Sequence, residues 1–259
     1  GFLCRIGTGI HTHEQIIEPA FTDTLTILKN LKSTLDYYAP QTLRCVATSA
    51  LRDAKNAQDF IDSVLDTGYS MDIISGEEEA RLTSRAVHFF MPDIHDELLF
   101  IDQGGGSVEF IRHSSGKEYP FSLNLGIVRL SERFFTSYPP QKEQLKELTH
   151  YIRTYLHKTL EPILTPPVTQ LIIIGGTAAT TSMINQNLPQ FNSAKVHNTQ
   201  IPRTFLRYLI KQLLTLSLED LAHRFSLHPR RADIFLAGLV QIETILKWCK
   251  LDHFQVCDR

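Results

Sequence analysis

Residues 98–109 read LLFIDQGGGSVE, and this stretch decides the fold class. Its first four residues are apolar and predict a short buried strand that ends at Asp102. Three glycines follow at 104–106, where they allow a tight turn, and strand character resumes at Val108. The stretch therefore predicts two strands joined by a glycine turn.

Outward from this hairpin, short apolar runs alternate with longer amphipathic patterns, which is typical of an α/β protein. The predicted strands cover residues 43–48, 69–74, 98–101, 108–112, 121–125 and 168–174. Helical spacing covers residues 14–38 and 50–65, the segments that begin at 76 and 178, and most of the chain from 202 to 248. The polar stretch 186–201 predicts a loop. The pattern as a whole predicts two α/β lobes joined near residues 75–97.

The composition narrows the classes of function. The chain has 259 residues, of which 42% are hydrophobic and 21% are charged, enough for one large domain or two smaller ones. Its net charge of −2 argues against a general nucleic-acid or membrane-surface binder. The four cysteines form no Cys-x-x-Cys pair, and no apolar run approaches the ~20 residues that a transmembrane helix needs. We expect a cytoplasmic protein with no membrane or nucleic-acid partner.

The glycine turn is a candidate phosphate site. Successive glycines let neighbouring amide groups point into one concave turn, which suits a phosphate group. Asp102 ends the strand before the glycines, where a carboxylate can hold a divalent cation or orient water, and Glu109, across the hairpin, is a candidate to face the same site. The alternative is a structural hairpin with permissive glycines. The acids on either side favour phosphate chemistry.

A second glycine loop, Gly175-Gly176-Thr177, follows the predicted strand 168–174 and opens a helix. Free amides and the dipole at a helix start favour an anion. A tight strand-to-helix turn uses glycine equally well, so this loop alone does not separate binding from structure.

Three charged features lie near predicted helix starts. Arg52 is placed so that its guanidinium can reach phosphate oxygens, although it also fits the surface of a first helical turn. The acids at 77–79 fit a solvated cap, and because Glu78 and Glu79 do not share a helix face, at most one of them points into a cleft. The basic turn at 228–231 fits a solvated cap, with contact to a polyanion as the alternative.

Taken together and in order, these segments resemble the exopolyphosphatase/guanosine-pentaphosphate phosphatase (Ppx/GppA) family, which belongs to the actin-like ATPase superfamily of sugar kinases, actin and 70-kDa heat-shock proteins. The matching segments are residues 5–10 (RIGTGI), 47–56 (ATSALRDAKN), 74–82 (ISGEEEARL), 102–109 (DQGGGSVE), 125–126 (LG), 129–130 (RL), 175–177 (GGT), 231–233 (RAD), Gly238 and 258–259 (DR). The resemblance covers nearly the whole chain, and the segments around Glu79 and at 102–109 are its specific parts.

This resemblance implies an α/β fold of two ribonuclease-H-like (actin-like ATPase) lobes with a cleft between them. It assigns residues 1–77 to the first lobe and 78–259 to the second, with the last residues as candidates to return to the first lobe. The family's first phosphate loop, of Asp-x-Gly type, has no counterpart before Arg5. We therefore expect a first lobe that lacks its initial strands and one phosphate loop.

The resemblance also implies a role for each site residue. Glu79 matches the glutamate that activates the attacking water, and Arg52 matches an arginine that faces the transferred phosphoryl group. Asp102 and Glu109 match acids associated with the lytic water and with a divalent cation, for which Mg²⁺ is expected. The implied phosphate-binding residues are Gly104, Gly105, Gly106 and Ser107 in one loop and Gly175, Gly176 and Thr177 in the other. Gln103 departs from the small apolar residue usual at its position, and the loop is expected to tolerate it.

The function that we expect is hydrolysis of a phosphoanhydride, releasing the terminal phosphate of inorganic polyphosphate by attack of water with Glu79 as the base. Hydrolysis of guanosine pentaphosphate is an alternative that the motifs leave open. A kinase on the same fold is disfavoured by the segment around Glu79, which is specific to the hydrolases. An alternative of another class is a regulatory module that binds polyphosphate or a nucleotide without turnover. A homodimer is the expected option for assembly.

Overall fold

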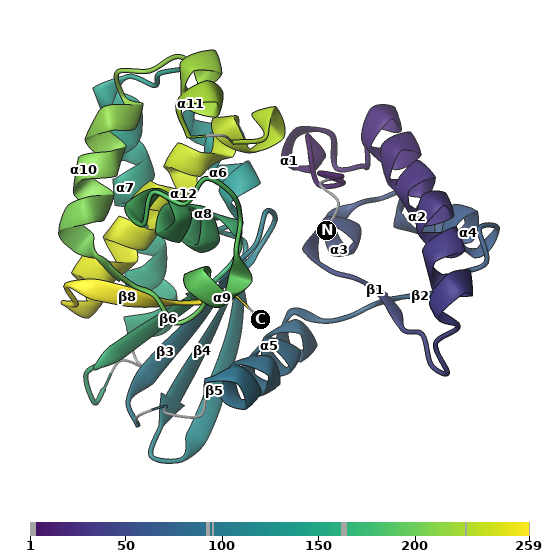
Figure 1. The fold of residues 1–259 in the computed structure, drawn as a ribbon, viewed down its shortest axis with the longest axis horizontal. Helices are drawn as coiled ribbons and strands as arrows, with labels where there is room; N and C mark the ends of the chain where they lie inside the picture. Colours follow the sequence, from purple (N-terminus) through teal and green to yellow (C-terminus); the bar gives the residue numbers. More distant parts are fainter. Residues whose placement is uncertain (1–3, 92–93, 95, 162–164, 226, 259) are drawn as a thin grey trace. The chain divides into compact units, whose positions relative to one another are not determined.

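The computed structural model describes residues 4–91, 94, 96–161, 165–225 and 227–258. The chain divides into two compact units, Gly1–Glu79 and Ala80–Arg259 (Figure 1). The boundary falls inside helix α5 (Gly76–Phe90), whereas the predicted division lies between residues 77 and 78. Arg259, the last residue of the family-like segments, lies outside the described residues. Among the described residues, no helix combines the length and apolar character needed to span a membrane.

The first unit packs helices against a two-stranded parallel sheet, β1 (Cys45–Ala47) and β2 (Met71–Ile73). Its helices are α1 (Ile10–His13), α2 (Glu18–Tyr38), α3 (Ser49–Asp53), α4 (Ala57–Leu65) and the first turn of α5. Phe60 of α4 is fully buried, and its ring meets Phe21 of α2 edge-on with centroids 4.9 Å apart. The apolar spacing along α2 and α4 therefore builds this core.

The single helix predicted over residues 50–65 is wrong, because the structure has two helices, α3 and α4, with a break at 54–56. The side chain of Asn56 explains the break. Its Oδ1 accepts from the backbone N–H of Ile16 at 2.8 Å, and its Nδ2 donates to the Ile16 carbonyl at 3.0 Å. A side-chain amide engaged with a distant backbone competes with continuation of the helix.

The second unit is built on a six-stranded sheet of order β5-β4-β3-β6-β8-β7. The strands are β3 (Leu98–Gln103), β4 (Val108–Ser114), β5 (Lys117–Leu123), β6 (Gln170–Ile174), β7 (Gln200–Pro202) and β8 (His253–Cys257). Strand β3 pairs antiparallel with β4 and parallel with β6, and β4 pairs antiparallel with β5. The predicted glycine hairpin and the predicted strand before the second glycine loop are confirmed.

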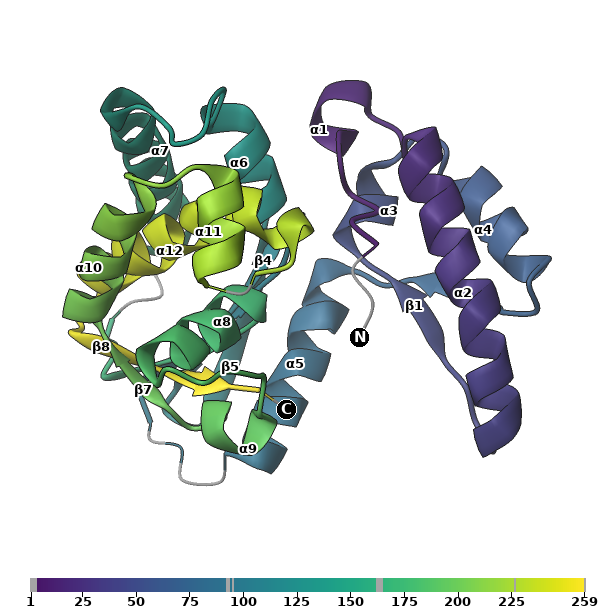
Figure 2. The ribbon, with the colours of Figure 1, turned by 45° about the horizontal axis from the view of Figure 1, so that its top comes forward.

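Helices cover both faces of this sheet (Figures 1 and 2). The larger core involves α6 (Ile127–Phe134), α7 (Lys142–Leu160), α8 (Gly176–Asn185), α10 (Arg203–Leu213), α11 (Leu218–Arg224) and α12 (Pro229–Cys249). Leu99 and Ile101 of β3 join this core, whereas Leu98 and Phe100 join a smaller core with α5. Since side chains alternate along a strand, the residue at 102 belongs to the α5 face and the residue at 103 to the α12 face.

One prediction for the C-terminal part of the chain is wrong, and one strand there was not predicted. The stretch 186–201, predicted as a loop, contains α9 (Ser193–Val196) and the start of β7. The segment after α12 is the strand β8, which lies between β6 and β7 in the sheet. Strand β7 is at the sheet edge, where a polar sequence is tolerated. Strand β8 has only five residues, too few for alternation to stand out beside the helix of 21 residues that precedes it.

Candidate active site

The start of α6 binds the glycine turn between β3 and β4. Three backbone N–H groups bind the three glycine carbonyls: Gly126 donates to Gly106 at 3.3 Å, Ile127 to Gly104 at 3.1 Å, and Val128 to Gly105 at 3.0 Å. The backbones at Gly126 and Gly105 lie so close together that a Cβ on Gly126 would be 2.2 Å from the Gly105 carbonyl oxygen. Position 126 therefore requires glycine.

The same turn leaves its hydrogen-bond donors available. In the part of the chain that the structure describes, the N–H groups of Gly104, Gly105 and Gly106 have no acceptor. Consecutive backbone N–H groups in a turn form a concave site for anions. Because the glycine carbonyls are already bound to α6, the turn can offer a ligand donors rather than acceptors. This is the arrangement that a phosphate group requires.

Two carboxylates flank the turn on one face of the hairpin. Asp102 and Glu109 are direct partners in the antiparallel register, so their side chains point to the same face. Glu109 is 1% exposed and accepts hydrogen bonds from Ser107 Oγ at 2.7 Å and Ser122 Oγ at 2.8 Å. Asp102 Oδ2 accepts from Thr83 Oγ1 of α5 at 3.1 Å. The two predicted metal ligands therefore lie together.

This pair of acids suits Mg²⁺. The described residues contain no group of three or more His, Cys, Asp or Glu side chains arranged to hold a metal ion. Mg²⁺ does not need such a group, because it is commonly bound by one or two carboxylates together with water and substrate phosphates. Hard carboxylate oxygens beside an anion-binding turn fit that description. The residues present therefore fit the ion, and its binding stays a prediction.

The second glycine loop lies against the first. Gly175 adopts a φ of +124°, and a Cβ there would lie 2.7 Å from the backbone oxygen of Gln103. The next residue begins α8, and the first N–H groups of a helix have no intrahelical acceptor. Thr177 is 3% exposed, and its Oγ1 lies 2.5 Å from the position that a Cβ on Gly238 of α12 would occupy. Both predicted phosphate loops thus share one end of the sheet.

A cationic side chain that the sequence analysis assigned to a solvated cap also lies at this loop. Arg231, in the first turn of α12, has its Nη1 2.9 Å from the position of a Cβ on Gly176. The cap itself is made by His228, whose Nδ1 accepts from the N–H of Arg230 at 3.1 Å. Contact with a polyanion was the alternative interpretation of this basic turn, and Arg231 begins the family-like segment 231–233; the fold brings α12 to the start of α8.

In the first unit, the two predicted catalytic residues bind each other. Both Nη atoms of Arg52 donate to Glu79 Oε2 at 3.1 Å, and Nη1 also donates to the Ile74 carbonyl at 2.8 Å. The side chains of Arg52 and Glu79 are 23% and 19% exposed. Arg52 comes from the end of α3 and Glu79 from the first turn of α5. The guanidinium therefore fixes the carboxylate while part of each group stays accessible.

The neighbouring acid points elsewhere. Glu78 forms an ion pair with Arg44 at 3.9 Å, and its backbone N–H is capped by Ser75 Oγ at 3.1 Å. The prediction that Glu78 and Glu79 do not share a face is confirmed, since each has a different arginine partner.

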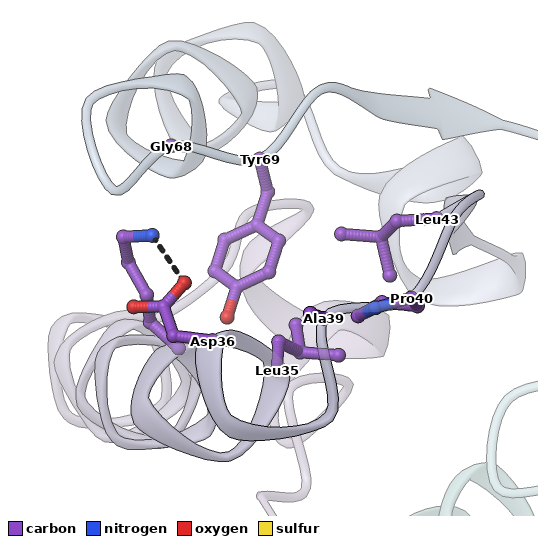
Figure 3. Close-up of a pocket in the computed structure, with 8 residues that line it drawn as sticks. Leu35, Asp36, Ala39, Pro40, Leu43, Gly68 and Tyr69 are labelled. Atoms are coloured by element: carbon purple, nitrogen blue, oxygen red, sulfur yellow. Dashed lines mark hydrogen bonds and ion pairs between the residues drawn. The ribbon is translucent and has the colours of Figure 1, made fainter.

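The first unit also contains a pocket of about 340 Å³ (Figure 3). It is lined by Lys32, Leu35, Asp36, Ala39, Pro40, Leu43, Gly68 and Tyr69. None of these is a predicted site residue, and its one drawn ion pair joins Lys32 Nζ to Asp36 Oδ1 at 3.0 Å. The pocket therefore lacks the glycine turns and the paired carboxylates of the site in the second unit.

Comparison with known proteins gives the family. The model of the Ppx/GppA phosphatase family matches residues 2–259. The chain belongs to the Ppx/GppA phosphatase family. Membership identifies it as a hydrolase that acts on phosphoanhydrides, as the resemblance implied.

Relatives and solved structures agree with this family. Exopolyphosphatase 2 of Mycobacterium tuberculosis is 26% identical over 251 residues, which cover 95% of this chain and 79% of that protein. The crystal structure of an exopolyphosphatase from Cytophaga hutchinsonii is 27% identical with a TM-score of 0.89, covering 98% of this chain and 82% of that one. The Ppx/GppA family member of Aquifex aeolicus is 28% identical with a TM-score of 0.81, covering 99% and 83%. The predicted fold class is confirmed.

Proposed function

We propose that this member of the Ppx/GppA phosphatase family releases the terminal phosphate of inorganic polyphosphate by metal-assisted attack of water. The observation that supports the proposal is the glycine turn 104–106, whose carbonyls are bound to α6 and whose N–H groups are open beside Asp102 and Glu109. Polyphosphate presents repeated phosphate groups. A site of backbone donors with two nearby carboxylates for a cation suits such a chain.

Binding and charge neutralisation fall to the second unit. Oxygens of two phosphate groups accept hydrogen bonds from the N–H groups of the two glycine loops, and the guanidinium of Arg231 at Gly176 adds positive charge. A Mg²⁺ ion held by Asp102 and Glu109 supplies charge neutralisation at the phosphate oxygens when it is bound. Preorganised donors of this kind act most strongly where negative charge develops during phosphoryl transfer.

The proton of the attacking water goes to Glu79 in this proposal. The water oxygen forms a bond to the terminal phosphorus, the bridging P–O bond breaks, and the shortened chain leaves with the electron pair. The carboxylate of Glu79 accepts the proton that the water loses. Arg52 holds this carboxylate through one oxygen, Oε2, which leaves Oε1 as the candidate acceptor.

The test is phosphate release from three substrates compared side by side: inorganic polyphosphate, guanosine pentaphosphate and ATP. We expect the highest kcat/KM on polyphosphate, because its repeated phosphates engage both glycine loops. Preference for guanosine pentaphosphate would replace the proposed substrate and keep the reaction. Binding of polyphosphate with no release of phosphate, in the presence of Mg²⁺, would overturn the proposal in favour of a regulatory module.

A further inference from the structure

Two buried glutamines join the segments that carry the glycine loops. Gln103, the residue that departs from the family pattern, is 4% exposed, and Gln241 in α12 is 0% exposed. Gln103 Nε2 donates to Gln241 Oε1 at 2.8 Å and to the Gly238 carbonyl at 3.0 Å. Gln241 Nε2 donates to the Leu125 carbonyl at 2.6 Å. We call these two side chains, with their three hydrogen bonds, the glutamine brace.

At each end, the glutamine brace is bonded to a residue that lies next to the first glycine loop or next to a residue that binds this loop. Gln103 immediately precedes the glycine turn 104–106, and its own backbone oxygen lies against Gly175 of the second loop. Leu125 immediately precedes Gly126, whose N–H binds the turn at Gly106. The brace therefore connects the turn to the start of α6, the element whose N–H groups bind the turn.

The other end of the brace reaches the second loop. Gly238 accepts from Gln103 and lies against Thr177, so the segment of α12 that the brace holds is also the segment that limits the position of the second loop. Helix α12 lies beside α8 in both views (Figures 1 and 2). The brace thus contacts the segments that lie next to both loops.

An apolar residue at position 103 would fill the same space without fixing this distance. Hydrogen bonds are directional, whereas apolar packing tolerates small shifts between elements. The brace also carries a cost, because Gln103 Oε1 is buried and has no hydrogen-bond partner among the described residues. Gln170 Oε1 in β6 is likewise buried without a partner, so it is the position of Gln103 beside both loops, and not this cost, that sets Gln103 apart.

We propose that Gln103 and Gln241 are positioning residues that set the separation of the two phosphate loops, so that both bind neighbouring phosphate groups of one polyphosphate chain. This inference rests on the proposed function. It makes the brace, which touches no substrate, a determinant of KM rather than of the chemical step. It also predicts that the two glutamines act as one unit.

The test measures KM and kcat for polyphosphate in the intact protein with Gln103→Met, Gln241→Met and both changes together. Methionine keeps the length of the side chain and removes the amide. The matched control is Gln170→Met in β6. Gln170 Nε2 also donates to a glutamine, Gln255, at 2.8 Å. Gln170 is at the first residue of β6, whereas the second glycine loop follows the last residue of that strand. Melting temperature is measured for every variant, and the Kd for tripolyphosphate is measured by calorimetry.

We expect KM and the Kd for tripolyphosphate to rise roughly tenfold in each single brace variant, the scale of coupling in one hydrogen-bond network, with little change in kcat. The double variant should show the same KM as the singles while regaining part of the lost melting temperature, since it removes the unpaired amides. If Gln103→Met does not fold, Gln103→Asn replaces it, and a rise in KM and Kd is again expected because the side chain is one methylene shorter than the brace requires.

The inference is overturned if Gln170→Met raises KM as much as the brace variants, or if the effects of the two single changes multiply in the double variant. A failure of the proposed function would give a different result from a failure of this inference: the unmodified protein would release no phosphate from polyphosphate. In that case the tripolyphosphate Kd still reports whether the brace sets the loops.

Discussion

The carboxylate of Glu79 differs from those of the neighbouring acids in how firmly it is held. Both Nη atoms of Arg52 bind one of its oxygens, and Arg52 is itself tied to the backbone at Ile74. A fork of donors fixes the carboxylate in direction as well as in position. Glu78, one residue earlier, pairs with a different arginine, Arg44, at 3.9 Å.

Replacing Glu79 tests the base directly. We expect Glu79→Gln to lower kcat about 10²–10⁴-fold, the usual contribution of a general base, because the amide cannot accept the proton of water. Phosphate release from polyphosphate measures the loss. Glu78→Gln is the matched control on the same helical turn and should keep its activity. Equal activity of Glu79→Gln and the unmodified protein would remove Glu79 from the chemistry.

The second prediction at this scale concerns the cation. Asp102→Asn should raise the Mg²⁺ concentration needed for half-maximal activity at least about tenfold, since even changes to groups that merely orient a metal ligand have effects of this size. A chelator should abolish phosphate release, and added Mg²⁺ should restore it. Calorimetric titration with Mg²⁺ gives the affinity without relying on turnover.

Glu118→Gln is the control for the cation prediction. This carboxylate also lies in the second unit, where it accepts from Ser84 and pairs with His88 at 2.7 Å. Its loss should leave the Mg²⁺ requirement unchanged. An identical shift in both variants would mean that Asp102 contributes only general negative charge.

At the scale of elements, β3 and β4 are fastened together at the end away from the glycine turn. Arg112 is fully buried and donates to three carbonyls: His113 at 2.7 Å, Pro166 at 2.8 Å and Leu98 at 3.1 Å. It also forms an ion pair with Glu97. A buried carbonyl that loses its hydrogen-bond donor costs about 1–3 kcal/mol. Arg112→Met should therefore destabilise the second unit by about this amount, measured by denaturant unfolding.

The Arg112 cluster also predicts a dependence of stability on pH. Burial raises the pKa of Glu97, but hydrogen bonds from Ser114 and Arg112 and the charge of Arg112 outweigh it and hold the pKa below the ordinary 4.5. A depressed carboxyl pKa stabilises the fold above about pH 4.5, and this contribution is lost as the pH falls through the lowered value. Glu97→Gln should lower the melting temperature at pH 7 and have a progressively smaller effect below pH 4.5. Parallel melting profiles for the two proteins would contradict this.

The elements of the site were predictable to different degrees. The hairpin followed from its sequence, because a buried strand, three glycines and a second strand form a local pattern. The contact of Gly126 with the turn could not be predicted from the sequence. The residues around a glycine do not show whether it packs against a backbone segment 20 residues away. Gln241 was missed for the same reason, and Arg231 was named only as part of a family-like segment and of a basic turn. Helix α12 reaches the loops only in the folded sheet order, and helical periodicity assigns its residues to core or surface rather than to a site.

At the scale of the whole molecule, the two units have cores of very different size. The first depends on a small cluster around Phe60 and Val64 and on a sheet of two strands of three residues each. Two-stranded sheets have little stability of their own. The second unit has a six-stranded sheet with apolar clusters on both faces. A first lobe over residues 1–77 that lacks its initial strands and a longer second lobe over 78–259 were predicted from the sequence, but β7 and β8 were not recognised as strands of the larger sheet.

The unequal cores predict that the units lose structure separately. Phe60→Ala should remove about 3–5 kcal/mol from the first unit, because it leaves a cavity in a small core. Amide hydrogen exchange should then become faster in β1 and β2 and stay unchanged in β3 and β6. Phe254→Ala, in β8, is the reciprocal control and should affect β6 first. Uniform acceleration across both units in either variant would show a single cooperative structure.

The glycine turn 104–106 has a consequence for how the protein responds to its surroundings. Its available groups are backbone N–H donors, and its carbonyls are bound to α6. Peptide N–H groups neither gain nor lose a proton across the physiological range. The strength with which the turn binds an anion is therefore constant with acidity, and a pH–rate profile of this protein reports the ionisation of its carboxylates and of the phosphate chain itself.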